Sequence, residues 1–121
     1  MRKAIVAGML LLTAAPAAAT DVASFLVTAE AAKQNKLKAL MSGNAMRMMR
    51  EVQGSMKQLK AERLSAEAAG RHGSYCPNGA ASLTREELMA AIYAVPARER
   101  PQVQVKEALR RGLARKYPCG A

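Results

Sequence analysis

The chain of 121 residues contains very few aromatic side chains: no tryptophan, one phenylalanine and three tyrosines. Its core must therefore be built from leucine, methionine, valine, isoleucine and alanine. Together with the lysine, arginine and glutamate that cover the rest of the chain, these residues favour helices over strands. No stretch alternates apolar and polar residues between hairpin signals. The composition therefore predicts an all-α fold.

Cysteine and histidine are also scarce, since the chain has only Cys76, Cys119 and His72. A zinc site needs three or four ligands at regular spacing, and there is no C-x-x-C pair. A catalytic cysteine would need a base, which only His72 can supply. We therefore expect no metal site and no cysteine chemistry.

The sequence motifs of common enzymes are absent as well. We find no G-x-S-x-G, no glycine-rich phosphate loop and no H-E-x-x-H. Glu86 and Glu87 are adjacent and diverge by about 100° on a helix, so they do not form a facing acid/base pair. They are better placed to stabilise the start of a helix. The sequence predicts a protein that is not an enzyme, with no catalytic residue and no cofactor.

Methionine is the one abundant soft ligand, with eight in the chain. An exported protein could use such side chains, with His72, to bind Cu(I). The helical spacing favours packing instead, because Met46, Met48 and Met49 do not share a face. Met48 or Met49 fits a core stripe with Val52 and Met56, and methionine commonly fills helical cores.

No apolar run is long enough for a membrane-spanning helix, which needs about 20 residues. The longest begins at Ala4 and ends at Leu12, directly after Arg2 and Lys3. Small residues follow, with an A-x-A pattern that ends at Ala19. This arrangement is typical of a cleavable signal peptide. We predict a signal peptide at 1–19, a single mature domain at 20–121, and a periplasmic or secreted location.

Export bears on the two cysteines, because disulfides persist in oxidising compartments and are rare in a reducing cytosol. An even pair in an exported chain therefore predicts a structural bridge between Cys76 and Cys119.

Helix signals divide the mature chain into about four helices. Asp21 is a candidate N-cap for the first, and a short helical turn follows through Leu37, Leu40 and Met41. A long basic amphipathic helix is predicted at about 44–70, with Gly70 as its stop. Thr84 and Glu87 form a T-x-x-E capping box, and the last helix is expected at about 104–116. The predicted fold is a small helical domain whose C-terminal hairpin, about 76–119, is stapled by the disulfide.

The C-terminal part resembles a known family. It contains, in order, a cysteine and a proline before a turn, a short helix, a proline-containing connection and a final helix that ends in P-C. This arrangement is similar to that of the Rap/Tai family. These features lie at Cys76, Pro77, Leu83, Thr84, Leu88, Pro96, Ala108, Leu109, Pro118 and Cys119. The resemblance implies an exported all-α domain with a disulfide, of the type that neutralises type VI secretion amidases. Residues 20–70 lack the family's C-x-G-Y helix, so its immunity residues are not transferred.

The charge balance is strongly basic, with 19 lysines and arginines against 9 acidic residues. Such a charge attracts anionic partners. The predicted contacts on the long helix are Arg47, Arg50, Lys57, Lys60 and Arg63. Nucleic acid is not expected, because no stacking aromatics are interleaved. A simpler interpretation is a solvated basic face that keeps the protein soluble.

Two functional hypotheses follow. The first is an exported, non-catalytic protein-binding domain, of immunity or inhibitor type, that occludes a partner of unknown identity. The alternative is a basic envelope-associated module that contacts anionic surfaces through the long helix. Either hypothesis is compatible with a homodimer.

Overall fold

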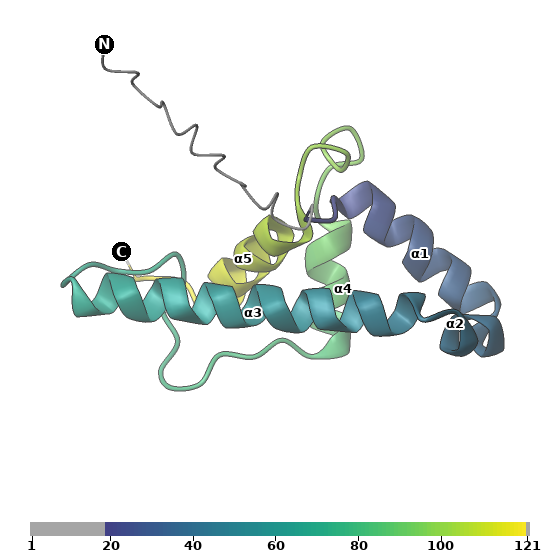
Figure 1. Ribbon diagram of the computed structural model, residues 1–121. Helices are drawn as coiled ribbons and strands as arrows, with labels where there is room; N and C mark the ends of the chain where they lie inside the picture. The colour runs from purple at the N-terminus through teal and green to yellow at the C-terminus, as the bar shows by residue number, and fades with distance from the viewer. Residues whose placement is uncertain (1–18, 121) are drawn as a thin grey trace, which may run out of the picture.

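The computed structural model describes residues 19–120, and within that range it contains five helices and no strand (Figure 1). The predicted all-α class is confirmed. The predicted signal peptide lies outside the described residues, except for Ala19. The helices are α1 (Val22–Gln34), α2 (Lys36–Ser42), α3 (Asn44–Ala68), α4 (Arg85–Tyr93) and α5 (Val105–Lys116).

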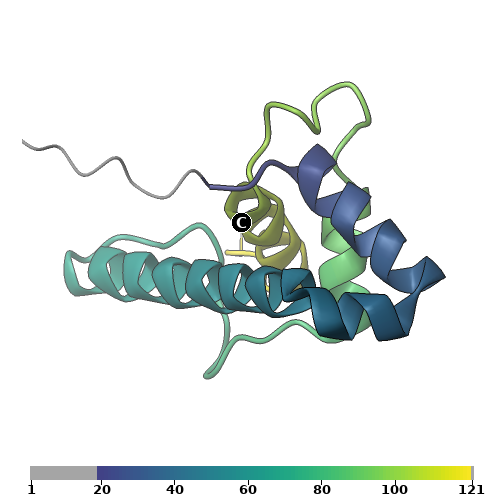
Figure 2. The same cartoon turned by 45° about the vertical axis from the view of Figure 1, so that its right-hand side comes forward.

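The long helix α3 forms the axis of the molecule, and α1, α4 and α5 lie along one side of it (Figures 1 and 2). α5 packs against α1, α3 and α4. The α1–α2 hairpin lies at the end of α3 where that helix begins. The core side chains come from α1, α3, α4, α5 and two loops: Val22, Phe25, Leu26, Ala29, Leu59, Tyr75, Ile92, Val95, Val105, Ala108, Leu109 and Leu113.

The boundary between α1 and α2 is set by one residue. The amide of Asn35 donates to the carbonyl of Ala31 at 3.2 Å and so ends α1. Its side-chain oxygen accepts from the amide of Lys38 at 3.0 Å and so caps α2. Because an N-cap stabilises even a short helix, the stretch that was expected as a helical turn forms a fifth helix.

The stripe predicted on α3 is resolved in favour of Met48. Met48, Val52 and Met56 pack against the core, Leu59 is fully buried, and Met49 is exposed. The helix ends before Gly70, which adopts a left-handed conformation with φ of 73°. This position is the stop that the sequence predicted.

The α4–α5 hairpin is held by capping and by close contact. The amide of Glu87 donates to the Thr84 hydroxyl at 3.1 Å, and the Thr84 amide donates to the Glu87 carboxylate at 3.0 Å, which completes the capping box. Gly112 faces Ala91 so closely that a β-carbon there would lie 2.5 Å from the Ala91 side chain. Only glycine allows the two helices this separation.

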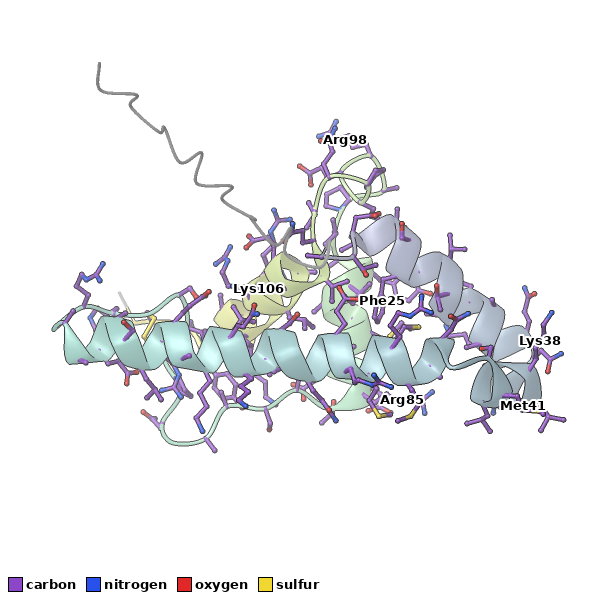
Figure 3. The ribbon with its side chains drawn as sticks, viewed as in Figure 1. Phe25, Lys38, Met41, Arg85, Arg98 and Lys106 are labelled. Carbon is purple, nitrogen blue, oxygen red and sulfur yellow. A yellow bond between two sulfur atoms is a disulfide. The ribbon has the colours of Figure 1, made fainter. Side chains whose placement is uncertain are left out.

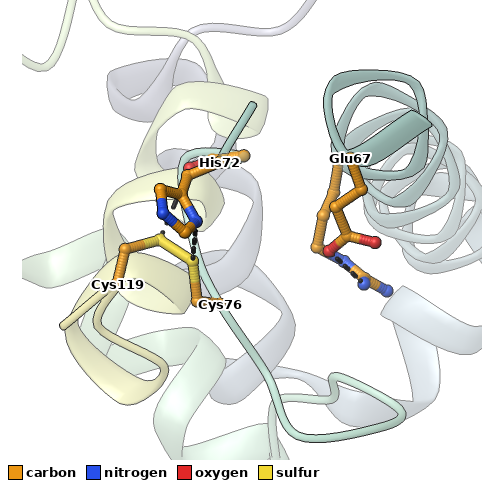
Figure 4. Close-up of a disulfide and its surroundings, with 6 residues drawn as sticks. Glu67, His72, Cys76 and Cys119 are labelled. Carbon is orange, nitrogen blue, oxygen red and sulfur yellow. Dashed lines mark hydrogen bonds and ion pairs between the residues drawn. A yellow bond between two sulfur atoms is a disulfide. The ribbon is translucent and has the colours of Figure 1, made fainter. Parts of the chain in front are cut away.

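The disulfide joins Cys76 and Cys119, as predicted, with a Cα–Cα distance of 4.8 Å (Figure 4). The amide of Cys76 also donates to the carbonyl of Tyr117 at 2.8 Å. The disulfide joins the residues after α5 to the loop that leads into α4, so the predicted staple is confirmed.

None of the helices in residues 19–120 combines the length and the apolar character that a membrane crossing requires.

Candidate interaction surface

The helix α2 has no buried residue, although three of its seven residues are strongly apolar. Leu37, Leu40 and Met41 follow the i, i+3, i+4 spacing that places side chains on one face of a helix. This face is turned to solvent, and the three residues are 71%, 75% and 81% exposed. Figure 3 shows Met41 and Lys38 projecting from α2 at the end of the molecule.

The first turns of α3 add two more exposed apolar residues, Met46 and Met49. They follow α2 directly, across the left-handed residue Gly43. We call Leu37, Leu40, Met41, Met46 and Met49 the apolar tip. Exposed apolar residues are ordinary when scattered, but a group of them at one end of a small domain marks an interaction site.

A pocket of about 470 Å³ lies beside the tip, between α1, α2 and the start of α3. Its walls combine polar side chains with small apolar ones, and the apolar ones include Val27, Ala31, Ala39 and Ala45. Lys38 contributes a cation at its edge. A pocket next to an exposed apolar face provides space that a side chain of a partner can fill.

The charge around the tip has one sign. Residues 31–50 contain five basic side chains and no acidic one: Lys33, Lys36, Lys38, Arg47 and Arg50. Lys33 is paired with Glu30 at 3.4 Å. The surroundings of the apolar tip therefore present a positive potential to an approaching partner.

Four of the five basic residues predicted as contacts on the long helix are exposed: Arg47, Arg50, Lys57 and Lys60, here called the basic row. At about 100° per residue, Arg47, Arg50 and Lys57 fall on the side of α3 opposite to Leu59 and Val52, and Lys60 falls on its flank. The row therefore faces away from the core and extends from the apolar tip along α3.

Arg63 does not belong to that surface, because it is only 8% exposed. Its guanidinium lies over the ring of buried Tyr75, 5.5 Å from the ring centroid, and pairs with Glu67 at 3.1 Å. Gly73 packs against its side chain. The stacking and the tight packing explain why this arginine is a structural residue that fixes the loop after α3.

A second pocket, of about 590 Å³, lies on the other side of α1, toward the α4–α5 connection. Tyr93 and Arg100 line it together with Glu30. The Tyr93 hydroxyl donates to the Glu30 carboxylate, and this bond, with the nearby Lys33, lowers the pKa of Glu30. Val27, an exposed apolar residue of α1, lines both pockets.

The other residues considered from the sequence lie elsewhere. His72 is exposed, with its Nδ1 atom 3.9 Å from the sulfur of Cys76 (Figure 4). Glu87 caps α4 and accepts from Lys116 at 2.8 Å, and these contacts lower its pKa to about 2. Within residues 19–120, no three histidine, cysteine or acidic side chains gather where they would hold a metal ion.

The residues that the structure brings together at the tip were not singled out as a site by their sequence pattern. Leu37, Leu40 and Met41 have the spacing of a core-facing helix, and Met46 and Met49 were assigned to packing or left undecided. A docking face and a core face have the same period. Only the folded structure shows that this face has no helix against it.

The described fold is thus a small, disulfide-stapled helical domain with one exposed apolar end. Comparison of the chain with protein-family models, with curated proteins and with solved structures finds no match. The function is therefore inferred from the geometry of this chain.

Proposed function

We propose that this chain is an exported, non-catalytic protein-binding domain, of immunity or inhibitor type, that occludes its partner with the apolar tip and the pocket beside it. The observation that supports this most strongly is α2, whose apolar face is exposed and whose every residue lies outside the core. The partner should be a protein with an apolar patch bordered by acidic side chains.

The tip has the composition of a protein contact. Methionine is enriched at protein interfaces, and its flexible thioether adapts to the shape of a partner. Full burial of a leucine or methionine side chain contributes about 1.5–3 kcal/mol. Burial of Leu37, Leu40 and Met41 therefore supplies a large share of the free energy of a stable complex, even after the cost of association.

Charge determines the kind of partner. Four of the five cations near the tip make no ion pair within residues 19–120, and they favour an acidic surface and increase the rate of encounter with it. A second copy of this chain would bring the same cations face to face, so a homodimer through the tip is disfavoured. A partner with an acidic rim around an apolar patch would complement both the apolar side chains of the tip and the cations around them.

The sequence adds two supports to this proposal. The A-x-A pattern that ends at Ala19 supports export. The resemblance of the Cys76 to Cys119 segment to the Rap/Tai family supports an immunity role, in which the partner would be a secreted amidase. Inhibition would then follow from covering the partner's surface and would need no catalytic residue in this chain.

Affinity capture from envelope and secreted fractions tests the proposal. The bait is the mature, disulfide-intact protein, washed in parallel at low and high salt. A Leu40→Ser/Met41→Ser variant serves as the test, and Leu64→Ser, which alters an exposed leucine far along α3, serves as the matched control. Hydrogen exchange of the captured complex then locates the contact on the bait.

The expected result is one stoichiometric protein that survives high salt, is lost from the double variant and is retained by Leu64→Ser. Amide protection should rise at residues 36–49. Equal retention by the wild type and the double variant, or protection confined to the basic row, would overturn the assignment to the tip.

A second candidate function is the envelope-associated module, favoured by the basic row on the outward side of α3. It predicts binding to vesicles that contain anionic lipid, and this binding should be lost as salt screens the charges. Replacing Lys57 and Lys60 with glutamine would weaken that binding and leave a salt-resistant protein complex unchanged.

A further inference from the structure

The chain enters the fold at Thr20. Ala19 is exposed, whereas Thr20 is partly buried and held on both sides of its backbone. Its amide donates to the carboxylate of Glu51 on α3 at 2.9 Å, and its carbonyl accepts from the amide of Val105 at 3.0 Å. Two residues on, the amide of Val22 donates to the carbonyl of Val103 at 2.8 Å. Figure 2 shows this segment passing the start of α5.

Glu51 is an unusual residue in its surroundings. It is the only acidic side chain between Glu30 and Glu62, in a stretch that is otherwise basic. Arg47 lies one turn earlier on the same helix, yet among residues 19–120 Glu51 makes no ion pair with any side chain. Its carboxylate is directed at the backbone nitrogen of Thr20 instead.

We propose that the peptide bond between Ala19 and Thr20 is the processing site, and that the new amino group of Thr20 forms an ion pair with Glu51. Hydrolysis adds one water molecule across the bond, leaving a carboxylate on Ala19 and an amino group on Thr20. That group is mostly an ammonium ion at pH 7. The reaction is catalysed by a signal peptidase, so the inference depends on the export in the proposed function and not on the partner.

The geometry favours this cut for two reasons. Every backbone hydrogen bond described above lies on the carboxyl side of the bond and is kept after cleavage. In addition, an amide that already donates to a carboxylate becomes a cation at the same position, and a charge-assisted hydrogen bond is stronger than a neutral one.

The charged groups at the N-cap of α1 and on α5 already have partners of their own. They are Asp21 with Ser24, Lys106 with Glu62, and Glu107 with Arg110 and Arg111. Glu51 is therefore the carboxylate available to the new ammonium ion. Its presence should raise the pKa of the amino group above the ordinary value of about 8.

Mass spectrometry of the protein recovered after export tests the first part of the inference. The expected N-terminal residue is Thr20. A chain that starts at another residue, or that keeps the leader, would overturn the inference. Retention of the leader would also contradict the proposed export. The binding test on the apolar tip does not depend on this outcome.

A double-mutant cycle tests the ion pair. Glu51→Gln is placed in a protein that starts at Thr20 and in one that keeps Ala18 and Ala19, so that the Thr20 nitrogen stays an amide. We expect Glu51→Gln to lower the folding equilibrium constant about threefold more in the first background at pH 7. This excess should disappear as the pH rises through the pKa of the amino group, because a group with a raised pKa stabilises the fold only while protonated.

Glu62→Gln, which removes a carboxylate paired with Lys106 on the same helix, is the control and should have the same effect in both backgrounds. An equal effect of Glu51→Gln in both backgrounds would overturn the ion pair, even where the protein begins at Thr20.

Discussion

The segment closed by the disulfide and the hairpin made by α1 and α2 use apolar side chains in opposite ways. In the closed segment, Ile92, Val95, Val105, Leu109 and Leu113 are at most 1% exposed. In α2, each of the three large apolar side chains is more than two-thirds exposed. One region uses its apolar surface to fold, and the other leaves it accessible.

The two regions also differ in how their ends are fixed. α4 begins with a complete capping box, and Lys116 near the end of α5 bonds both Glu87 and the carbonyl of Ser82. α3 begins after Gly43 without a side-chain cap. This contrast indicates that the stability of the domain is concentrated around α5 and depends less on the exposed end.

The largest effect is expected from removing the disulfide. The bridge joins residues 43 apart, and in the chain-entropy model its loss by Cys76→Ser with Cys119→Ser costs about 4 kcal/mol. Urea unfolding followed by circular dichroism measures the change. If the double variant keeps the wild-type midpoint, the contrast between the two regions does not depend on the staple.

A matched pair of leucines tests the contrast directly. Leu109→Ala removes a fully buried side chain from α5 and should cost about 3 kcal/mol, because it leaves a cavity in the core. Leu40→Ala in α2 should change the free energy of unfolding by less than about 0.5 kcal/mol. Equal losses would mean that the tip is buried in solution, for example by self-association.

A matched pair of glycines gives effects of opposite sign. Gly112→Ala places a β-carbon 2.5 Å from that of Ala91, so the two helices must move apart, at a cost of about 2 kcal/mol. Gly54→Ala meets nothing within 4 Å on the open side of α3 and should stabilise by about 1 kcal/mol. Thermal melting of both variants measures the difference, and stabilisation by Gly112→Ala would contradict the close packing of α4 on α5.

The smallest effect concerns acid stability. The pKa of Glu87 is lowered to about 2 from an ordinary value of 4.5, chiefly by the hydrogen bond from Lys116. A lowered pKa stabilises the fold above the unfolded value, and this contribution is lost as the pH falls from about 4.5 to about 2. Glu87→Gln should therefore flatten the acid side of the stability curve, whereas Glu86→Gln, an exposed neighbour, should leave it unchanged. Acid titration followed by circular dichroism distinguishes the two.

Much of the fold follows from local signals in the sequence. Asp21 as a cap, the box of Thr84 and Glu87, and Gly70 as a stop each act over a few residues, so their effect is visible without the rest of the chain. The disulfide was also predictable, because only one pairing exists for two cysteines. The helix α2 was underestimated because its cap, Asn35, also ends the preceding helix.

The candidate surface was much less predictable, because exposure depends on which elements meet in space. Arg63 and Lys60 are alike in the sequence, yet the loop after α3 returns over Arg63 and places Tyr75 under its guanidinium. Met48 and Met49 are adjacent, and only the packing of α3 decides which one is buried. Leu40 has the spacing of a core residue and no helix to pack against.

The double attachment of Thr20 has a consequence for the resistance of the proposed processed chain to exopeptidases. An aminopeptidase needs several free residues at the start of a chain, and loose termini are where such degradation begins. In a chain that starts at Thr20, the first amino group donates to Glu51 and the first carbonyl accepts from the amide of Val105. Trimming would therefore require the segment before α1 to detach from both α3 and α5, which protects the terminus without any chemical cap.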